Sequence, residues 1–101
     1  MMDEPLSVQA LSGVTIRLTA ERWEHIRSRH PELAPLQSPV LAAIQEPDVL
    51  HQGHARTIVA VKKQDSLYLI VIYREADRDD GFVVTAYLSR DTARGRVIWQ
   101  R

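Results

Sequence analysis

The chain has no cysteine, which excludes a disulfide framework, a thiolate nucleophile and a thiolate metal site. It also lacks an excess of charge of either sign, with 13 basic and 13 acidic residues apart from histidine. This balance counts against a dedicated non-specific nucleic-acid binder, because such domains are usually strongly basic. No apolar run approaches the roughly 18 residues of a membrane-spanning helix. The N-terminus lacks the basic and apolar regions of a signal peptide, so we expect a cytoplasmic protein without membrane contact.

Several catalytic signatures are missing as well. The sequence has no glycine-rich phosphate loop, no G-x-S-x-G elbow, no HExxH pair and no paired-carboxylate motif. A metal site needs three or four converging ligands, so we predict neither a metal nor a cofactor. The residue types left for chemistry are histidine, arginine, lysine, threonine, tyrosine and serine.

Length and apolar content define one domain. The chain has 101 residues, of which 45% are hydrophobic, enough for a single core without metal or disulfide support. Residues 1–12 show little periodicity and are predicted to form a loose N-terminal arm, followed by a single domain over residues 13–101. After a short strand at 14–18, Thr19 is a plausible N-cap for a helix that should end near His30, before Pro31.

A second helix is predicted over residues 39–46, with Ser38 as its N-cap and proline at its first position. The remaining chain is typical of strands, with a short one near 48–51, longer ones at 56–63, 67–74 and 82–89, and a last edge strand at 97–99. The connections between the long strands are short, which favours antiparallel pairing with 67–74 internal. We therefore predict an α+β fold in which N-terminal helices pack on an antiparallel sheet of about four strands.

The first helix carries two distinct faces. At about 100° per residue, Trp23, Ile26 and His30 fall on one side, which should pack on the sheet. Arg22, His25 and Arg29 share a neighbouring flank. This flank is either an ordinary solvated surface or an anion site, because clustered cations repel one another unless a counter-charge lies among them.

Polar groups also line the strand at 82–89. Alternation places Val83 with Thr85, Tyr87 and Ser89 on one face, and Phe82, Val84, Ala86 and Leu88 on the other. The three hydroxyls lie beside Arg90, the first of four arginines in residues 90–101. A half-exposed sheet face explains the same pattern, since threonine and tyrosine are good strand formers. Lys62 and Lys63 end an earlier strand, where lysines are common as solvated edge charges. Lys62 is also a candidate phosphate ligand.

These residue types suffice for RNA cleavage by internal transesterification. A base removes the 2′-hydroxyl proton, an acid protonates the leaving 5′-oxygen, and cations stabilise the charge that develops on phosphorus. Histidine suits the proton transfers because its reference pKa lies near neutral. Arginine suits the phosphate because its planar group can donate two hydrogen bonds at once.

The order of the motifs WEHIRSRHPEL, IQEPDVL, VAVKK, YLIVIYRE, GFVVTAYLS and RGRVIWQ resembles the phage-associated barnase–EndoU–colicin–RelE-like nuclease domains, the BECR fold. The resemblance covers about residues 15–100. It implies helices packed on an antiparallel sheet of about four strands and metal-independent ribonuclease activity of a toxin or phage-associated effector. It points to His25, His30 and Thr85 as catalytic residues and to basic residues following Thr85. The partners it implies are RNA and a protein antitoxin or inhibitor.

Two hypotheses follow from the sequence. The first is a metal-independent endoribonuclease in which His25 or His30 transfers protons, Thr85 and Tyr87 orient the substrate, and phosphate is contacted by Arg29, Lys62 and Arg90. The second is a non-catalytic binding module that retains the same fold. They are distinguished by whether the histidine, arginine and hydroxyl groups line one surface.

Overall fold

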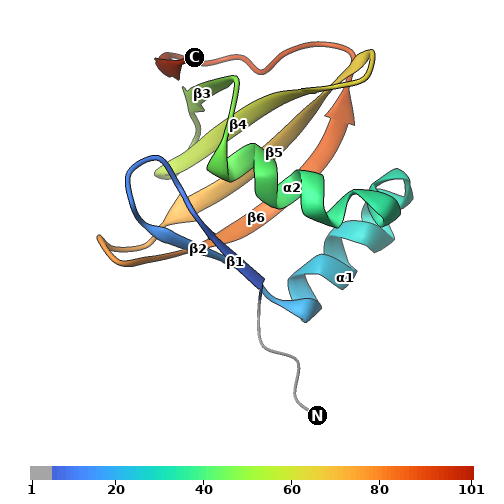
Figure 1. The fold of residues 1–101 in the computed structure, drawn as a ribbon, viewed down its shortest axis with the longest axis horizontal. Coiled ribbons are helices and arrows are strands. Elements are labelled where there is room, and N and C mark those ends of the chain that lie inside the picture. Colours follow the sequence, from blue (N-terminus) through green and yellow to red (C-terminus); the bar gives the residue numbers. More distant parts are fainter. Residues whose placement is uncertain (1–5) are drawn as a thin grey trace.

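A computed structural model of the protein describes residues 6–101, which form one mixed sheet with helices on one of its faces (Figure 1). The elements, in chain order, are β1 (Leu6–Gln9), β2 (Thr15–Leu18), α1 (Ala20–Arg29), the 3-10 helix η1 (Pro31–Leu36), α2 (Gln37–Gln45), β3 (Val49–Gln52), β4 (Thr57–Gln64), β5 (Leu67–Glu75), β6 (Asp80–Ser89) and β7 (Val97–Gln100).

The prediction of an antiparallel sheet of about four strands is wrong, because the sheet has seven strands in the order β1-β2-β6-β5-β4-β3-β7. Two of them precede the helices, and β2 pairs with β6 in parallel, with Thr15 opposite Asp80 and Arg17 opposite Phe82. Short loops indicate antiparallel pairing only between strands adjacent in sequence. The long path through the helices lets β2 return beside β6 as a parallel neighbour.

The predicted N-terminal arm is in part a strand of this sheet. Residues 1–5 of the arm lie outside the described residues, whereas Leu6–Gln9 pairs antiparallel with β2. Ala10 is 5% exposed and belongs to the core. Val8 packs against the same core, so this segment contributes to the folded domain through contacts that its own sequence pattern did not indicate.

The middle of the sheet agrees with the sequence analysis. Strands β4, β5 and β6 pair antiparallel in sequential order, and β5 is internal. Its near-continuous apolar sequence is explained by burial on both faces. Leu69 and Val71 belong to the core under the helices, whereas Ile70 belongs to a second cluster on the opposite face.

The helices begin and end for local reasons. The Thr19 hydroxyl accepts a hydrogen bond from the Arg22 backbone N–H at 3.0 Å, which confirms the predicted N-cap of α1. His30 is the C-cap, as Pro31 required. The prediction for the second helix is wrong in detail, because η1 fills residues 31–36 and α2 begins at Gln37 without a side-chain cap from Ser38.

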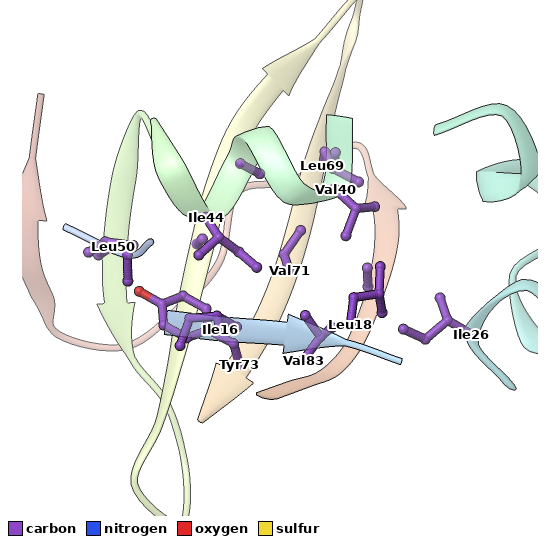
Figure 2. Packing of buried hydrophobic residues seen from close by; sticks show 14 of the residues in the cluster. Ile16, Leu18, Ile26, Val40, Ile44, Leu50, Leu69, Val71, Tyr73 and Val83 are labelled. Atoms are coloured by element: carbon purple, nitrogen blue, oxygen red, sulfur yellow. The ribbon is translucent and has the colours of Figure 1, made fainter. Parts of the chain in front are cut away.

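The main core lies between α2, α1 and the sheet (Figure 2). Val40 and Ile44 of α2 and Ile26 of α1 are fully buried against it, whereas Trp23 is only partly buried at its margin. The buried residues that meet them from the sheet are Ile16, Leu18, Leu69, Val71, Tyr73 and Val83. Among the helices of residues 6–101, none is long and apolar enough to cross a membrane.

Candidate functional site

The site forms where helix α1 lies against β6. Strand β2 covers the edge of β6 only from Asp80 to Phe82, so the rest of that edge has no strand neighbour. Helix α1 lies beside this part of β6 (Figure 1), and the Arg22 guanidinium donates a hydrogen bond to the carbonyl oxygen of Val84 at 3.3 Å. The flank of α1 that carries Arg22 therefore borders the uncovered edge of the sheet.

A β-bulge in β6 precedes Thr85, Tyr87 and Ser89, which we call the hydroxyl row. Ile72 is opposite Thr85 but Tyr73 is opposite Val83, so Val84 is an extra residue. The predicted alternation is wrong at Val83, which the bulge turns into the core under the helices. Strict alternation could not reveal this, because a bulge shifts the parity of every residue before it.

Thr85, Tyr87 and Ser89 nevertheless share one face, as predicted. They are opposite Ile72, Ile70 and Tyr68 in turn, and Ile70 belongs to the cluster on the face away from the helices. We call this the open face of the sheet.

His30 joins this row through its ring. The His30 and Tyr87 ring centroids are 6.0 Å apart, with an angle of 35° between the ring planes. The His30 backbone N–H donates to the Ile26 carbonyl at 2.8 Å, which fixes the position of the residue. Its Nδ1 lies 3.8 Å from the Glu32 carboxylate, a length that permits only a weak ion pair when the ring is charged. The His30 side chain is half-buried, with 33% of its surface exposed.

His25 and Arg29, the other predicted cations of α1, are both exposed. His25 lines a shallow hollow of about 270 Å³ with Thr19, Glu21 and Arg22, and does not share the contact of His30 with Tyr87. Arg29 precedes His30 and is exposed, and Arg90 is exposed directly after β6. Within residues 6–101, Arg22, Arg29 and Arg90 make no salt bridge. Arg22 and Arg29 precede His30 in the chain, and Arg90 follows Tyr87. None of the three arginines is paired with an acidic side chain of residues 6–101.

Lys62 lies on the opposite side of the sheet from Thr85. It is paired with Leu69, which faces the helices, and its Nζ donates to the Glu46 carbonyl oxygen at 2.6 Å. The structure therefore does not bring it to the hydroxyl row. Lys63 faces the other way, and its Nζ lies 4.8 Å from the centre of the Tyr68 ring. Once the register of β4 against β5 is known, the alternation of side chains places Lys63, and not Lys62, on the face that carries the hydroxyls.

Residues 90–96, which we call the crossing segment, pass over the open face from the end of β6 to β7. Ala93 packs on the cluster of Val59, Val61 and Ile70. His51 is 6% exposed, and its Nδ1 is 3.0 Å from the Gly95 carbonyl oxygen. The residues around His51 do not indicate this contact, because nothing local shows that residue 95 returns to it.

A hollow of about 430 Å³ opens beside the crossing segment. The residues that line it are Gln52, Gly53, His54, Thr57, Val59, Ile72, Arg94 and Gly95. Because Ile72 is opposite Thr85, this hollow lies next to the hydroxyl row on the open face. Within residues 6–101, no group of three or more histidine, aspartate or glutamate side chains could hold a metal ion.

Comparison with protein-family models, with curated proteins and with solved structures finds no match to this chain. The function of the site must therefore be inferred from its own residues.

Proposed function

We propose that this protein is a metal-independent endoribonuclease-like domain that cleaves RNA through its 2′-hydroxyl. The observation that carries the proposal is the contact between the His30 and Tyr87 rings at the uncovered edge of β6. Two further hydroxyls of the open face, those of Thr85 and Ser89, lie two residues to either side of Tyr87 on β6. Arg29 and Arg90, both exposed, supply positive charge next to this pair in the chain.

The chemistry assigns a role to each of these groups. His30 removes the proton from the 2′-hydroxyl, whose oxygen attacks the adjacent phosphorus. A bond from O2′ to phosphorus forms and the bond from phosphorus to O5′ breaks, while a water molecule gives a proton to O5′ and the resulting hydroxide takes up the proton held by His30. Tyr87 and Thr85 hydrogen-bond the phosphate oxygens, and the guanidinium of Arg29 stabilises the extra negative charge of the transition state.

His25 has a separate place in this proposal. It lies with Arg22 on the flank that borders β6, in a hollow that does not include His30. We assign it to binding the RNA strand beyond the cleaved bond. The proposal places this activity in the cytoplasm, where RNA substrates occur.

The decisive experiment uses an oligonucleotide with a single ribonucleotide in a DNA strand, incubated with the purified protein in EDTA. Cleavage should occur only at the ribonucleotide and should leave a 2′,3′-cyclic phosphate, detectable by mass spectrometry. His30→Ala should lower the rate by about 10² to 10⁴, the usual contribution of general acid–base catalysis. An all-DNA strand that is cut equally well, or a fully active His30→Ala protein, would refute the proposal.

Arg29 has a matched control on the same helix. Arg29→Ala should slow cleavage about 10-fold or more, since the phosphate loses a cation. Arg27→Ala should leave the rate unchanged, because Arg27 is exposed and pairs with Glu24. Equal effects of the two variants would show that only the general charge of α1 matters.

A specific observation favours the second candidate, a binding module with the same fold. Strand β7 is the last in the sheet order, and its side chains Val97, Ile98 and Trp99 are 48%, 42% and 38% exposed. Such an edge can pair with an added strand. If two copies of β7 paired antiparallel about the centre of the strand, Arg96 of each copy would lie opposite Arg101 of the other, and the like charges would repel. An acidic strand of a protein inhibitor therefore fits this edge better than a second copy.

An acidic strand peptide of alternating valine and glutamate tests this candidate. It should change the fluorescence of Trp99, and Ile98→Asp should weaken its binding at least 10-fold. Unchanged binding by that variant would exclude β7 as the interface.

A further inference from the structure

We propose that the hollow of about 430 Å³ between the crossing segment and the 53–57 hairpin binds the nucleobase of an RNA nucleotide next to the cleaved phosphate. This inference rests on the proposed ribonuclease function, and it adds the chemical class of the substrate group that the hollow accepts. The volume lies within the range of roughly 300–1,000 Å³ that is typical of small-molecule sites.

The floor of the hollow suits a flat aromatic ring. Val59 and Ile72 are cross-strand partners on β4 and β5, and Val59 is only 9% exposed. Adjacent strands are about 4.8 Å apart, so their two aliphatic side chains form a continuous apolar surface. A base that lies on this floor removes apolar area from water on both partners, which favours binding.

The rim supplies polar groups for the edge of the base. Gln52 and His54 are exposed at the border of the hollow and can donate or accept hydrogen bonds. Arg94 also lines the hollow, and its guanidinium can stack on a base or bind its phosphate. An apolar floor with few convergent polar groups is the composition expected of a site for an unstacked base.

The wall of the hollow is held in place before a ligand binds. His51 contacts the Gly95 carbonyl through its ring nitrogen at 3.0 Å, and the Gln52 N–H donates to the Arg96 carbonyl at 2.8 Å. Gly95 has φ +109°, and a Cβ there would lie 2.7 Å from the Gln52 carbonyl oxygen. The segment that carries Arg94 is thus tied to β3 at Gly95 and Arg96, which lowers the entropy lost on binding.

The hollow also lies at the right place relative to the proposed catalytic groups. Val59, Ile72 and Thr85 form one row across β4, β5 and β6. Tyr87, which contacts His30, is two residues further along β6, or roughly 7 Å away. A base above Val59 and Ile72 therefore leaves its 3′-phosphate within reach of Thr85 and Tyr87.

Titration of the ¹⁵N-labelled protein with nucleoside 3′-monophosphates tests the assignment without catalysis, and ribose 5-phosphate and inorganic phosphate serve as base-free probes. The nucleotide should shift the amides of Gly53, His54 and Gly95 at lower concentration than either base-free probe. Arg94→Ala should weaken nucleotide binding at least 10-fold. Arg101→Ala is the matched control and should change it less than 2-fold, because Arg101 lies outside the hollow and pairs with Asp48. Shifts that are equal for ribose 5-phosphate, or that avoid these amides, would overturn the inference.

Its failure can be separated from failure of the ribonuclease proposal. RNA cleavage that depends on His30, without nucleotide shifts at the hollow, would refute the base site alone. Nucleotide binding that depends on Arg94, in a protein that cleaves no RNA, would refute the catalytic function and support the base site.

Discussion

His30 and Tyr87 show how single residues acquire a role from their surroundings. His30 is a helix C-cap that precedes a proline, which would suffice to explain its presence. Its ring instead lies against a tyrosine from a strand 57 positions later in the chain (87 minus 30). Arg22 likewise reaches the carbonyl oxygen of Val84 in the bulge of β6. These two contacts bring α1 and β6 together and create the proposed site.

Tyr73 gives a prediction about pH. It is 1% exposed, and its burial, with the nearby Glu75 carboxylate, raises the pKa of its hydroxyl well above the usual value near 10. Above pH 10 the unfolded chain loses this proton while the folded chain retains it. The stabilising contribution is therefore fully present below pH 10 and declines as the pH rises further, by up to about 1.4 kcal/mol per pH unit.

Urea unfolding at pH 9, 10 and 11 measures this effect. Tyr73→Phe should remove the decline that this residue causes, whereas Tyr68→Phe should retain it, since Tyr68 is half-buried on the open face. The same alkaline decline in Tyr73→Phe would show that Tyr73 is not its source.

At the scale of elements, the two faces of β4 make different contacts. Lys62 binds a carbonyl at the C-terminal end of α2, where helix carbonyls lack backbone partners. Lys63 points to the open face beside Tyr68. Neighbouring lysines of one strand thus serve different parts of the molecule.

These two lysines give a paired prediction. Lys62→Ala should lower the free energy of unfolding by about 1 kcal/mol through loss of its hydrogen bond, and should leave RNA binding unchanged. Lys63→Ala should hardly affect stability but should weaken RNA binding several-fold. Denaturant unfolding and RNA fluorescence anisotropy measure both, and a reversed pattern would mean that the register of β4 is misassigned.

The hairpin between β3 and β4 is a further element with a measurable consequence. Ala55 and Arg56 have φ values of 52° and 66°, and the Thr57 N–H donates to the His54 carbonyl at 2.9 Å. Positive φ at both central residues is the type I′ turn, which favours glycine at the second position. Residues other than glycine are strained there by roughly 1–2 kcal/mol each.

Arg56→Gly should therefore stabilise the protein by about 0.5–1 kcal/mol, after allowance for the more flexible unfolded chain. Gly95→Ala should have the opposite effect, because its added Cβ meets the Gln52 carbonyl oxygen. Thermal unfolding of both variants provides the measurement. A destabilised Arg56→Gly protein would show that this arginine makes contacts that outweigh its strain.

On the scale of the whole molecule, charge is balanced but unevenly distributed. The formal net charge is zero, yet four arginines lie between positions 90 and 101 with one acid, Asp91. Local positive charge can attract phosphate without making the whole chain a polyanion binder. Salt dependence distinguishes these two forms of binding.

If Arg22, Arg29 and Arg90 contact one phosphate each, three phosphates are neutralised. The logarithm of the affinity for single-stranded RNA should then fall with the logarithm of the salt concentration with a slope of about −2, or −0.7 per phosphate. Anisotropy between 50 and 200 mM salt gives this slope. A slope near zero would exclude phosphate contacts, and one steeper than about −5 would indicate general polyanion binding.

The amino-acid sequence by itself determined what depends on neighbouring residues. Thr19 starts α1 and Pro31 ends it, because capping and the restriction before proline act within one helical turn. The apolar run of β5 marked the centre of the sheet, because a strand covered on both faces has no polar side. The hydroxyls of Thr85, Tyr87 and Ser89 shared a face for the same local reason, the alternation of side chains along a strand.

Only the tertiary structure decided what depends on partners distant in sequence. The parallel pairing of β2 with β6, the bulge at Val84 and the side of the sheet on which Lys62 lies all follow from register between separate strands. The contacts of His30 with Tyr87 and of His51 with Gly95 depend on where the chain returns. No periodicity within one segment specifies such contacts, since they are selected by packing of the complete core.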